Sequence, residues 1–127
     1  MSAPHPLDVL VVDANFDEAE SCAILLGMLG HEVRIAGSCR EAHASVERFA
    51  PDIIVFDIGL PDGDGYALAG SLAARLKQRP VFVAVTGCGN HEDRSRNEGI
   101  DHHLLDPVEP EQLARVLEGV RPCGAVM

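Results

Sequence analysis

Residues 55–66, VFDIGLPDGDGY, join the end of an apolar strand to a loop that carries three aspartates. The predicted strand runs from Ile53 to Asp57, and its continuous apolar run is typical of a strand buried on both faces. Asp57 thus brings a carboxylate to the end of a core strand, far in sequence from any basic residue. Because a buried charge needs a partner, this position predicts a site where the carboxylate meets a cation.

Short apolar runs alternate with helix-period segments five times along the chain. Gly30 is placed to end the first helix, and Ser38 with Glu41 forms a capping box at the start of the second. This alternation predicts an α/β fold, a doubly wound five-stranded parallel sheet covered by helices on both faces. The predicted strands are 9–12, 33–36, 53–57, 81–86 and 104–105, and the predicted helices are 19–29, 38–49, 66–76, 92–98 and 111–120.

Length and composition predict one cytoplasmic domain over residues 1–127, with its core at about 7–120 and a loose tail at 121–127. No apolar run approaches the roughly 20 residues of a membrane span, and no secretion signal precedes the first strand. The four cysteines are scattered, which favours reduced thiols. The net charge of −10 argues against direct nucleic-acid binding, which needs clustered basic residues.

Four polar residues follow the predicted strands, namely Asp13, Asp57, Thr86 and Asp106. Ligands of doubly wound sheets bind at the carboxyl ends of the strands, so one pocket is expected to hold all four. Paired carboxylates suit Mg2+, which prefers oxygen ligands. A carboxylate beside such a cation can act as a nucleophile toward a phosphoryl group, with the Thr86 hydroxyl near a phosphoryl oxygen.

Four segments together resemble the receiver domain of two-component response regulators, over essentially the whole chain. They are VLVVDANFDEAE (9–20), PDIIVFDIGLPDGDGY (51–66), VFVAVTG (81–87) and DHHLLDPVEP (101–110). The segments TGCGN (86–90) and DHHLLDP (101–107) are most similar to the corresponding segments of receivers attached to hybrid sensor kinases. The resemblance implies a flavodoxin-like fold.

The same resemblance implies a role for each matching residue. Asp57 matches the phosphate-accepting aspartate, and Asp13, Asp57 and the main-chain carbonyl of Gly59 match the Mg2+ ligands. Thr86 matches the hydroxyl that contacts the phosphoryl group, and His103 matches a rotating switch residue, usually aromatic. The implied partners are a histidine kinase or phosphotransfer domain and a downstream protein, and the domain itself is not expected to be an enzyme.

Two positions depart from the family pattern at chemically important places. Ala14 replaces the second residue of the acidic pair, and Asp106 replaces a lysine that contacts the phosphoryl group. The single lysine, Lys77, precedes the fourth strand at the opposite end of the sheet, and nothing in the sequence establishes Arg94 as a substitute. Two carboxylates ~4 Å apart repel by roughly 4 kcal/mol at an effective dielectric near 20. The departures predict weak Mg2+ binding, unless Asp106 serves as a replacement metal ligand.

Three functional classes follow from these residues. The first is a phosphoacceptor with weakened Mg2+-assisted chemistry, and the second is a degenerate receiver that binds proteins without phosphorylation. The third, an Mg2+-dependent phosphatase, is disfavoured because Gly59 occupies the position of its second aspartate. Within DGDG, Asp62 and Asp64 are expected to face solvent from a turn.

Overall fold

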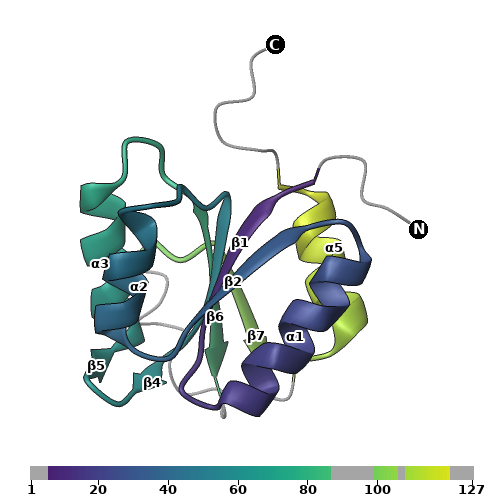
Figure 1. The fold of residues 1–127 in the computed structure, drawn as a ribbon, viewed down its shortest axis with the longest axis horizontal. Helices are drawn as coiled ribbons and strands as arrows, with labels where there is room; N and C mark the ends of the chain where they lie inside the picture. Colours follow the sequence, from purple (N-terminus) through teal and green to yellow (C-terminus); the bar gives the residue numbers. More distant parts are fainter. Residues whose placement is uncertain (1–5, 87–98, 106–107, 121–127) are drawn as a thin grey trace.

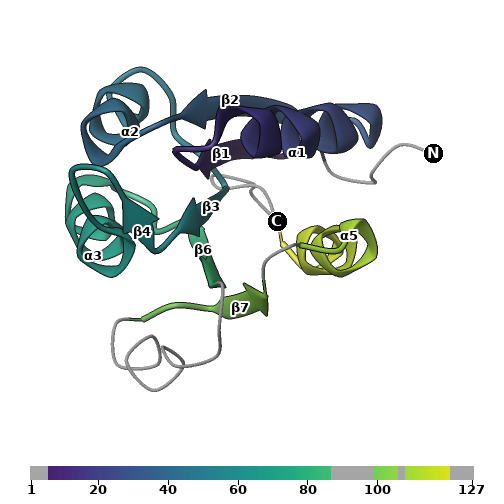
Figure 2. The ribbon, with the colours of Figure 1, turned by 90° about the horizontal axis from the view of Figure 1, so that it is seen from below.

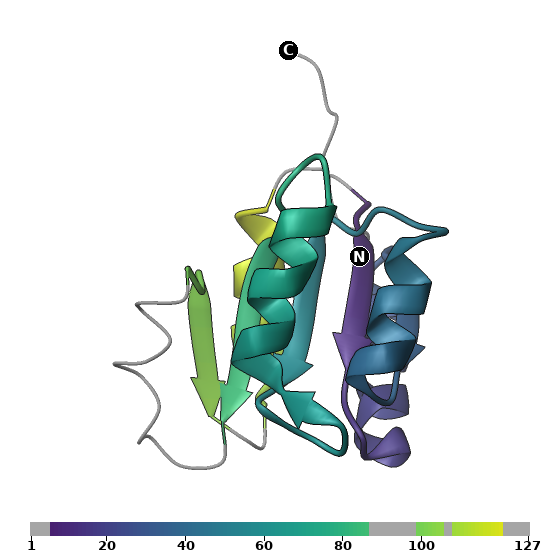
Figure 3. The same ribbon diagram turned by 90° about the vertical axis from the view of Figure 1, so that its left-hand side faces the viewer.

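A computed structural model describes residues 6–86, 99–105 and 108–120 of the chain. Five strands form one parallel sheet in the order β2-β1-β3-β6-β7, which confirms the predicted doubly wound α/β fold. All of them point toward the same edge (Figure 3). The strands are β1 (Asp8–Val12), β2 (Glu32–Ala36), β3 (Ile53–Asp57), β6 (Val81–Thr86) and β7 (His102–Leu105).

Helices cover both faces of this sheet (Figure 1 and Figure 2). The pair α1 (Phe16–Met28) and α5 (Pro110–Glu118) lies on one face, and the pair α2 (Cys39–Val46) and α3 (Gly65–Arg75) lies on the other. The strand order reverses at β1, since β2 lies on one side of it and β3 on the other. A ligand site is therefore expected at the carboxyl ends of β1 and β3.

The core explains why β3 reads as apolar throughout. Ile54 and Phe56 pack into the cluster beneath α2 and α3, whereas Ile53 and Val55 pack into the cluster beneath α1 and α5. The Phe56 ring also meets the rings of Tyr66 and Phe82 edge to face, at centroid distances of 6.4 and 6.3 Å. Both faces of β3 are thus buried, and the strand end that carries Asp57 is held rigidly from two sides.

Most predicted boundaries agree with the structure to within one residue, but α1 begins three residues earlier than predicted, β7 begins two residues earlier, and α2 and α5 end three and two residues earlier. Gly30 has φ +99°, the left-handed conformation that a glycine after a helix readily adopts. The helix α2 ends at Val46, not at Phe49, and its last turn tightens through bonds from Glu47 and Arg48 to the carbonyls three residues earlier. The chain then turns so that Phe49 packs on the core under the Arg34 guanidinium, 4.5 Å from the ring centroid.

The loop after β3 forms a small hairpin that the sequence predicted only as a turn. Strands β4 (Gly59–Leu60) and β5 (Gly63–Asp64) pair antiparallel, which leaves Pro61 and Asp62 as the two-residue turn. The predicted helix at 92–98 and the predicted tail at 121–127 lie outside the described residues. No helix in the described parts of the chain has the length and apolar character needed to cross a membrane.

Candidate functional site

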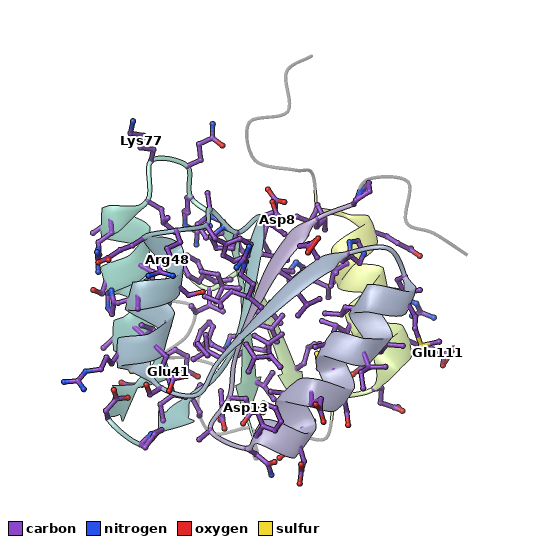
Figure 4. The ribbon with its side chains drawn as sticks, viewed as in Figure 1. Asp8, Asp13, Glu41, Arg48, Lys77 and Glu111 are labelled. Atoms are coloured by element: carbon purple, nitrogen blue, oxygen red, sulfur yellow. The ribbon has the colours of Figure 1, made fainter. Side chains whose placement is uncertain are left out.

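Asp13 and Asp57 lie side by side at the carboxyl edge of the sheet, as predicted. In the β1–β3 pair Val12 is opposite Phe56, so the two aspartates follow equivalent positions on neighbouring strands. Both side chains are half-buried. Figure 4 shows Asp13 at this edge and Asp8 at the other. The strand register therefore brings two carboxylates together at the carboxyl ends of β1 and β3, where the strand order reverses.

A cavity of about 420 Å³ opens beside these two aspartates. Its walls are largely aliphatic, from side chains of β1, β3, β6, α1 and α5, and its acidic lining comprises Asp13, Asp17, Glu18 and Asp57. The sequence reasoning missed Asp17 and Glu18. The signal for them is their place in the first turn of α1, directly after the β1 loop.

Hydrogen bonds from backbone N–H groups two residues further along the chain orient the two central carboxylates. Oδ1 of Asp57 accepts from the Gly59 N–H at 3.3 Å, and Oδ1 of Asp13 accepts from the Asn15 N–H at 2.9 Å. Asn15 in turn caps α1 by accepting from the Glu18 N–H at 3.2 Å. Each carboxylate is thus oriented by the loop that follows it, before any ligand arrives.

Cys22 lines the same cavity, and burial together with the nearby Asp13 carboxylate raises its pKa to about 11. A thiol with this pKa stays protonated at neutral pH, so it supplies neither a nucleophile nor a thiolate ligand. Cys22 and Cys39 are both free thiols, as predicted. The site therefore presents oxygen groups.

These oxygen groups fit Mg2+, although with fewer carboxylates than the family pattern implies. Asp13 and Asp57 line one cavity. Gly59 lies next to this cavity, because its N–H donates to the Asp57 carboxylate. Ala14 is exposed and offers no ligand. No group of three or more His, Cys, Asp or Glu side chains able to hold a metal occurs within residues 6–86, 99–105 and 108–120. Backbone carbonyl and water would have to complete the coordination.

Of the other predicted positions, Thr86 and Lys77 lie in the described parts of the chain. Thr86 ends β6 one residue after Val85, which pairs with Asp57, so its backbone reaches the same edge. Asp106 lies outside the described residues. Lys77 lies at the opposite end of the sheet from Asp13, as expected (Figure 4). The described residues therefore supply no lysine to this edge.

The two histidines of β7 point to opposite faces, as predicted. His102 is exposed, whereas His103 is half-buried and its Nε2 atom is fully buried. His103 pairs with Ala84, which belongs to the core cluster on the α2–α3 side. Its place next to β6 is compatible with the switch position that the resemblance implies.

Asp62 and Asp64 correct the expectation that both simply face solvent. Asp64 caps α3, since its Oδ1 accepts from the Tyr66 N–H at 3.0 Å. Asp62 is exposed, but its carboxylate accepts from two backbone N–H groups at the start of α2. Helix N-termini carry unpaired N–H donors, so both aspartates act as caps.

A family model, related sequences and solved structures all identify the same family for this chain. The sequence matches the family model of the response regulator receiver domain over residues 9–118. An uncharacterised 14.6 kDa protein of the sodA1 3′ region of Leptolyngbya boryana is 30% identical over 115 residues, covering 88% of each chain. A CheY-like receiver domain structure from Methylobacillus flagellatus has a TM-score of 0.83 at 29% identity, covering 89% of this chain and 97% of that one.

Other relatives are longer than this chain. The phosphate regulon transcriptional regulatory protein PhoB of Pseudomonas aeruginosa is 29% identical over 88% of this chain, which spans 50% of PhoB. Histidine protein kinase 1 of Candida albicans is 27% identical over 94% of this chain, which spans 5% of that kinase. The family model covers most of the sequence, including Asp13 and Asp57 at the sheet edge. The chain therefore belongs to the response regulator receiver domain family.

Proposed function

We propose that this receiver accepts a phosphoryl group on Asp57, with Mg2+-assisted chemistry that is weaker than the family pattern implies. The observation that supports the proposal is the placement of Asp57 and Asp13 in one cavity at the carboxyl edge of the sheet. The expected donor is a histidine kinase or phosphotransfer domain, and the expected reader is a downstream protein.

The transfer step follows from the geometry of Asp57. Its Oδ1 is engaged by the Gly59 N–H, so Oδ2 is the oxygen assigned to attack the phosphorus. A new O–P bond forms as the P–N bond of a phosphohistidine breaks, and the bonding electron pair leaves on the imidazole nitrogen, which takes up a proton. Bound Mg2+, held by Asp13, Asp57 and the Gly59 carbonyl, would offset the negative charge of the transferred group.

Two missing groups limit this chemistry. Ala14 supplies no metal ligand, and the lysine position holds Asp106. A charge-assisted hydrogen bond contributes about 1.5–3 kcal/mol, so its loss alone would slow transfer by roughly tenfold or more. The acidic lining from Asp17 and Glu18 adds negative charge beside the incoming phosphoryl group.

A second candidate function is a protein-interaction module that works without phosphorylation. It is favoured by the exposed Ala14, where a carboxylate is missing, and by Lys77, which lies at the far end of the sheet. In either case we propose a cytoplasmic signalling domain that has no enzymatic activity toward other substrates. The net charge of −10 supports the further proposal that it does not bind nucleic acid directly.

A time course with acetyl phosphate and Mg2+, followed by Phos-tag electrophoresis, separates the two candidates. The phosphoacceptor account expects one slowly formed shifted species that is absent when EDTA is added. The interaction-module account expects no shifted species at any time, in a protein whose folding is confirmed by circular dichroism.

A further inference from the structure

The carboxylate of Asp62 joins the turn of the β4–β5 hairpin to the start of α2. Its Oδ1 accepts from the Cys39 N–H at 2.8 Å and its Oδ2 accepts from the Arg40 N–H at 3.1 Å. These backbone groups precede Asp62 by 23 and 22 residues, so the contact is tertiary. The two N–H groups lower the pKa of Asp62, which keeps its carboxylate charged at neutral pH.

The N–H groups in the first turn of α2 show why this contact matters to the helix. The first intrahelical hydrogen bond runs from the Ala42 N–H to the Ser38 carbonyl at 3.0 Å, so the N–H groups of Cys39, Arg40 and Glu41 come before it and need other acceptors. The Ser38 Oγ accepts from the Glu41 N–H at 3.1 Å, and Asp62 accepts from the other two. The hairpin therefore supplies the acceptors for two of these three donors, and the local cap supplies one.

The hairpin connects Asp62 to the candidate metal site. Gly59 is paired with Asp64 across the hairpin, and its N–H binds the Asp57 carboxylate. At the base, the Gly65 N–H donates to the Ile58 carbonyl at 2.9 Å. Because Asp64 caps α3, the hairpin is anchored at its base on α3 and at its turn on α2.

The turn of the β4–β5 hairpin lies close to the first residue of α2. A Cβ atom at Gly63 would stand 3.1 Å from the Cys39 sulfur, so the hairpin and the first residue of α2 are in direct contact. Leu60, which pairs with Gly63, is 9% exposed and packs into the core cluster beneath α2 and α3. Little freedom remains for the segment 59–64 while Asp62 stays bound.

We infer that Asp62 is a positioning residue for the Mg2+ site: by binding the N-terminus of α2, it holds the loop that presents the Gly59 carbonyl. This inference rests on the proposed function for its metal, but the contact itself is independent of any ligand. A residue that orients a metal ligand from outside the coordination shell commonly contributes substantially to metal affinity. The same link couples movement of Gly59 to movement of α2.

The test compares three variants with the wild-type chain. Asp62→Ala removes the charge and both hydrogen bonds, and Asp62→Asn removes the same charge but keeps an oxygen acceptor. Ser38→Ala weakens the same helix N-terminus without touching the hairpin. Mg2+ affinity is measured by NMR titration of the Gly59 and Asp13 amides, and hydrogen exchange is measured at the amides of Gly59 and Cys39.

The inference expects Asp62→Ala to weaken Mg2+ affinity by about tenfold, the lower end of the effect of residues that orient metal ligands, with Asp62→Asn in between. It also expects faster exchange at Gly59 in Asp62→Ala, while Ser38→Ala lowers the melting temperature but leaves the Mg2+ affinity within about twofold. Equal weakening by Ser38→Ala and Asp62→Ala, or unchanged exchange at Gly59 in Asp62→Ala, would overturn it. If wild type binds no Mg2+, the proposed function fails, and the exchange rates at Gly59 still decide the inference.

Discussion

Gly65 lies directly against the backbone of Asp57: a Cβ atom at residue 65 would stand 2.5 Å from the Asp57 carbonyl oxygen. It would also stand 2.8 Å from the Cα of Ile58, and both neighbours are backbone atoms that cannot rotate away. The first residue of α3 must therefore be glycine for the helix to begin this close to the end of β3. The position of Asp57 depends on that close approach.

Gly65→Ala should consequently disturb the site as well as the fold. We expect a loss of about 1–3 kcal/mol in the free energy of unfolding, because overpacking forces backbone shifts. We also expect slower phosphorylation of Asp57, because the backbone shift moves the peptide group of Asp57 itself. Urea unfolding and the rate of modification by acetyl phosphate measure the two effects.

Gly59→Ala is the matched control for the unfolding measurement. A Cβ atom at Gly59 meets nothing within 4 Å, and its φ is not positive, so the substitution has room. Unfolding free energies that are equal for the two variants would show that the contact between Gly65 and Asp57 is not a constraint.

The double change Ala14→Asp with Asp106→Lys should accelerate phosphorylation beyond either single change. The first restores an oxygen ligand for the cation, and the exposed position of Ala14 leaves room for it. The second replaces the Asp106 carboxylate by a cationic donor. Both act on the same charged group, so their effects are expected to be coupled. Rates for wild type, both single variants and the double variant give the coupling, and a double variant no faster than wild type would rule out these positions as the cause.

His31 should make the domain less stable as the pH falls below neutrality. The residue is 8% exposed and its Nδ1 accepts from the Leu7 N–H at 3.0 Å, and burial lowers its pKa below the ordinary 6.5. The unfolded chain then binds more protons, so the stabilisation is complete above pH 6.5 and is lost as the pH falls toward the lowered folded-state pKa. Urea unfolding at several pH values should show this slope in wild type and in His102→Gln, but not in His31→Gln.

We expect the ionised carboxylate of Asp8 to destabilise the folded domain at neutral pH. Burial and the carboxylates of Asp52 and Glu32 raise its pKa, while Arg34 opposes the rise. Because the folded state favours the protonated acid, the free energy of unfolding falls as the pH rises from 3.8 through the raised pKa. Asp8→Asn should therefore raise the melting temperature at pH 7, with little effect at low pH. A variant that melts below wild type at pH 7 would contradict this reasoning.

Sequence patterns were sufficient for the parts of the structure that local chemistry determines. The apolar run at 53–57 predicts a doubly buried strand, and parallel alignment of strand ends then predicts that Asp13 meets Asp57. Gly30 and the Ser38–Glu41 box mark helix ends because capping is a contact between residues close in sequence.

The features that the sequence did not predict depend on tertiary contacts. Val46 ends α2 early because Phe49 turns back onto the core, which helical periodicity does not encode. Asp62 looks like a turn residue in the sequence, but it caps a helix 23 residues earlier. The requirement for glycine at 65 comes from how closely α3 approaches β3.

The most direct test of the central claim is the intact mass of the chain after incubation with acetyl phosphate and Mg2+, for wild type and Asp57→Asn. The account predicts that wild type gains the mass of one phosphoryl group and that Asp57→Asn, with its fold confirmed by circular dichroism, gains none. A wild-type chain that stays unmodified would contradict the claim that this receiver is a phosphoacceptor. An equally modified Asp57→Asn variant would contradict the assignment of Asp57.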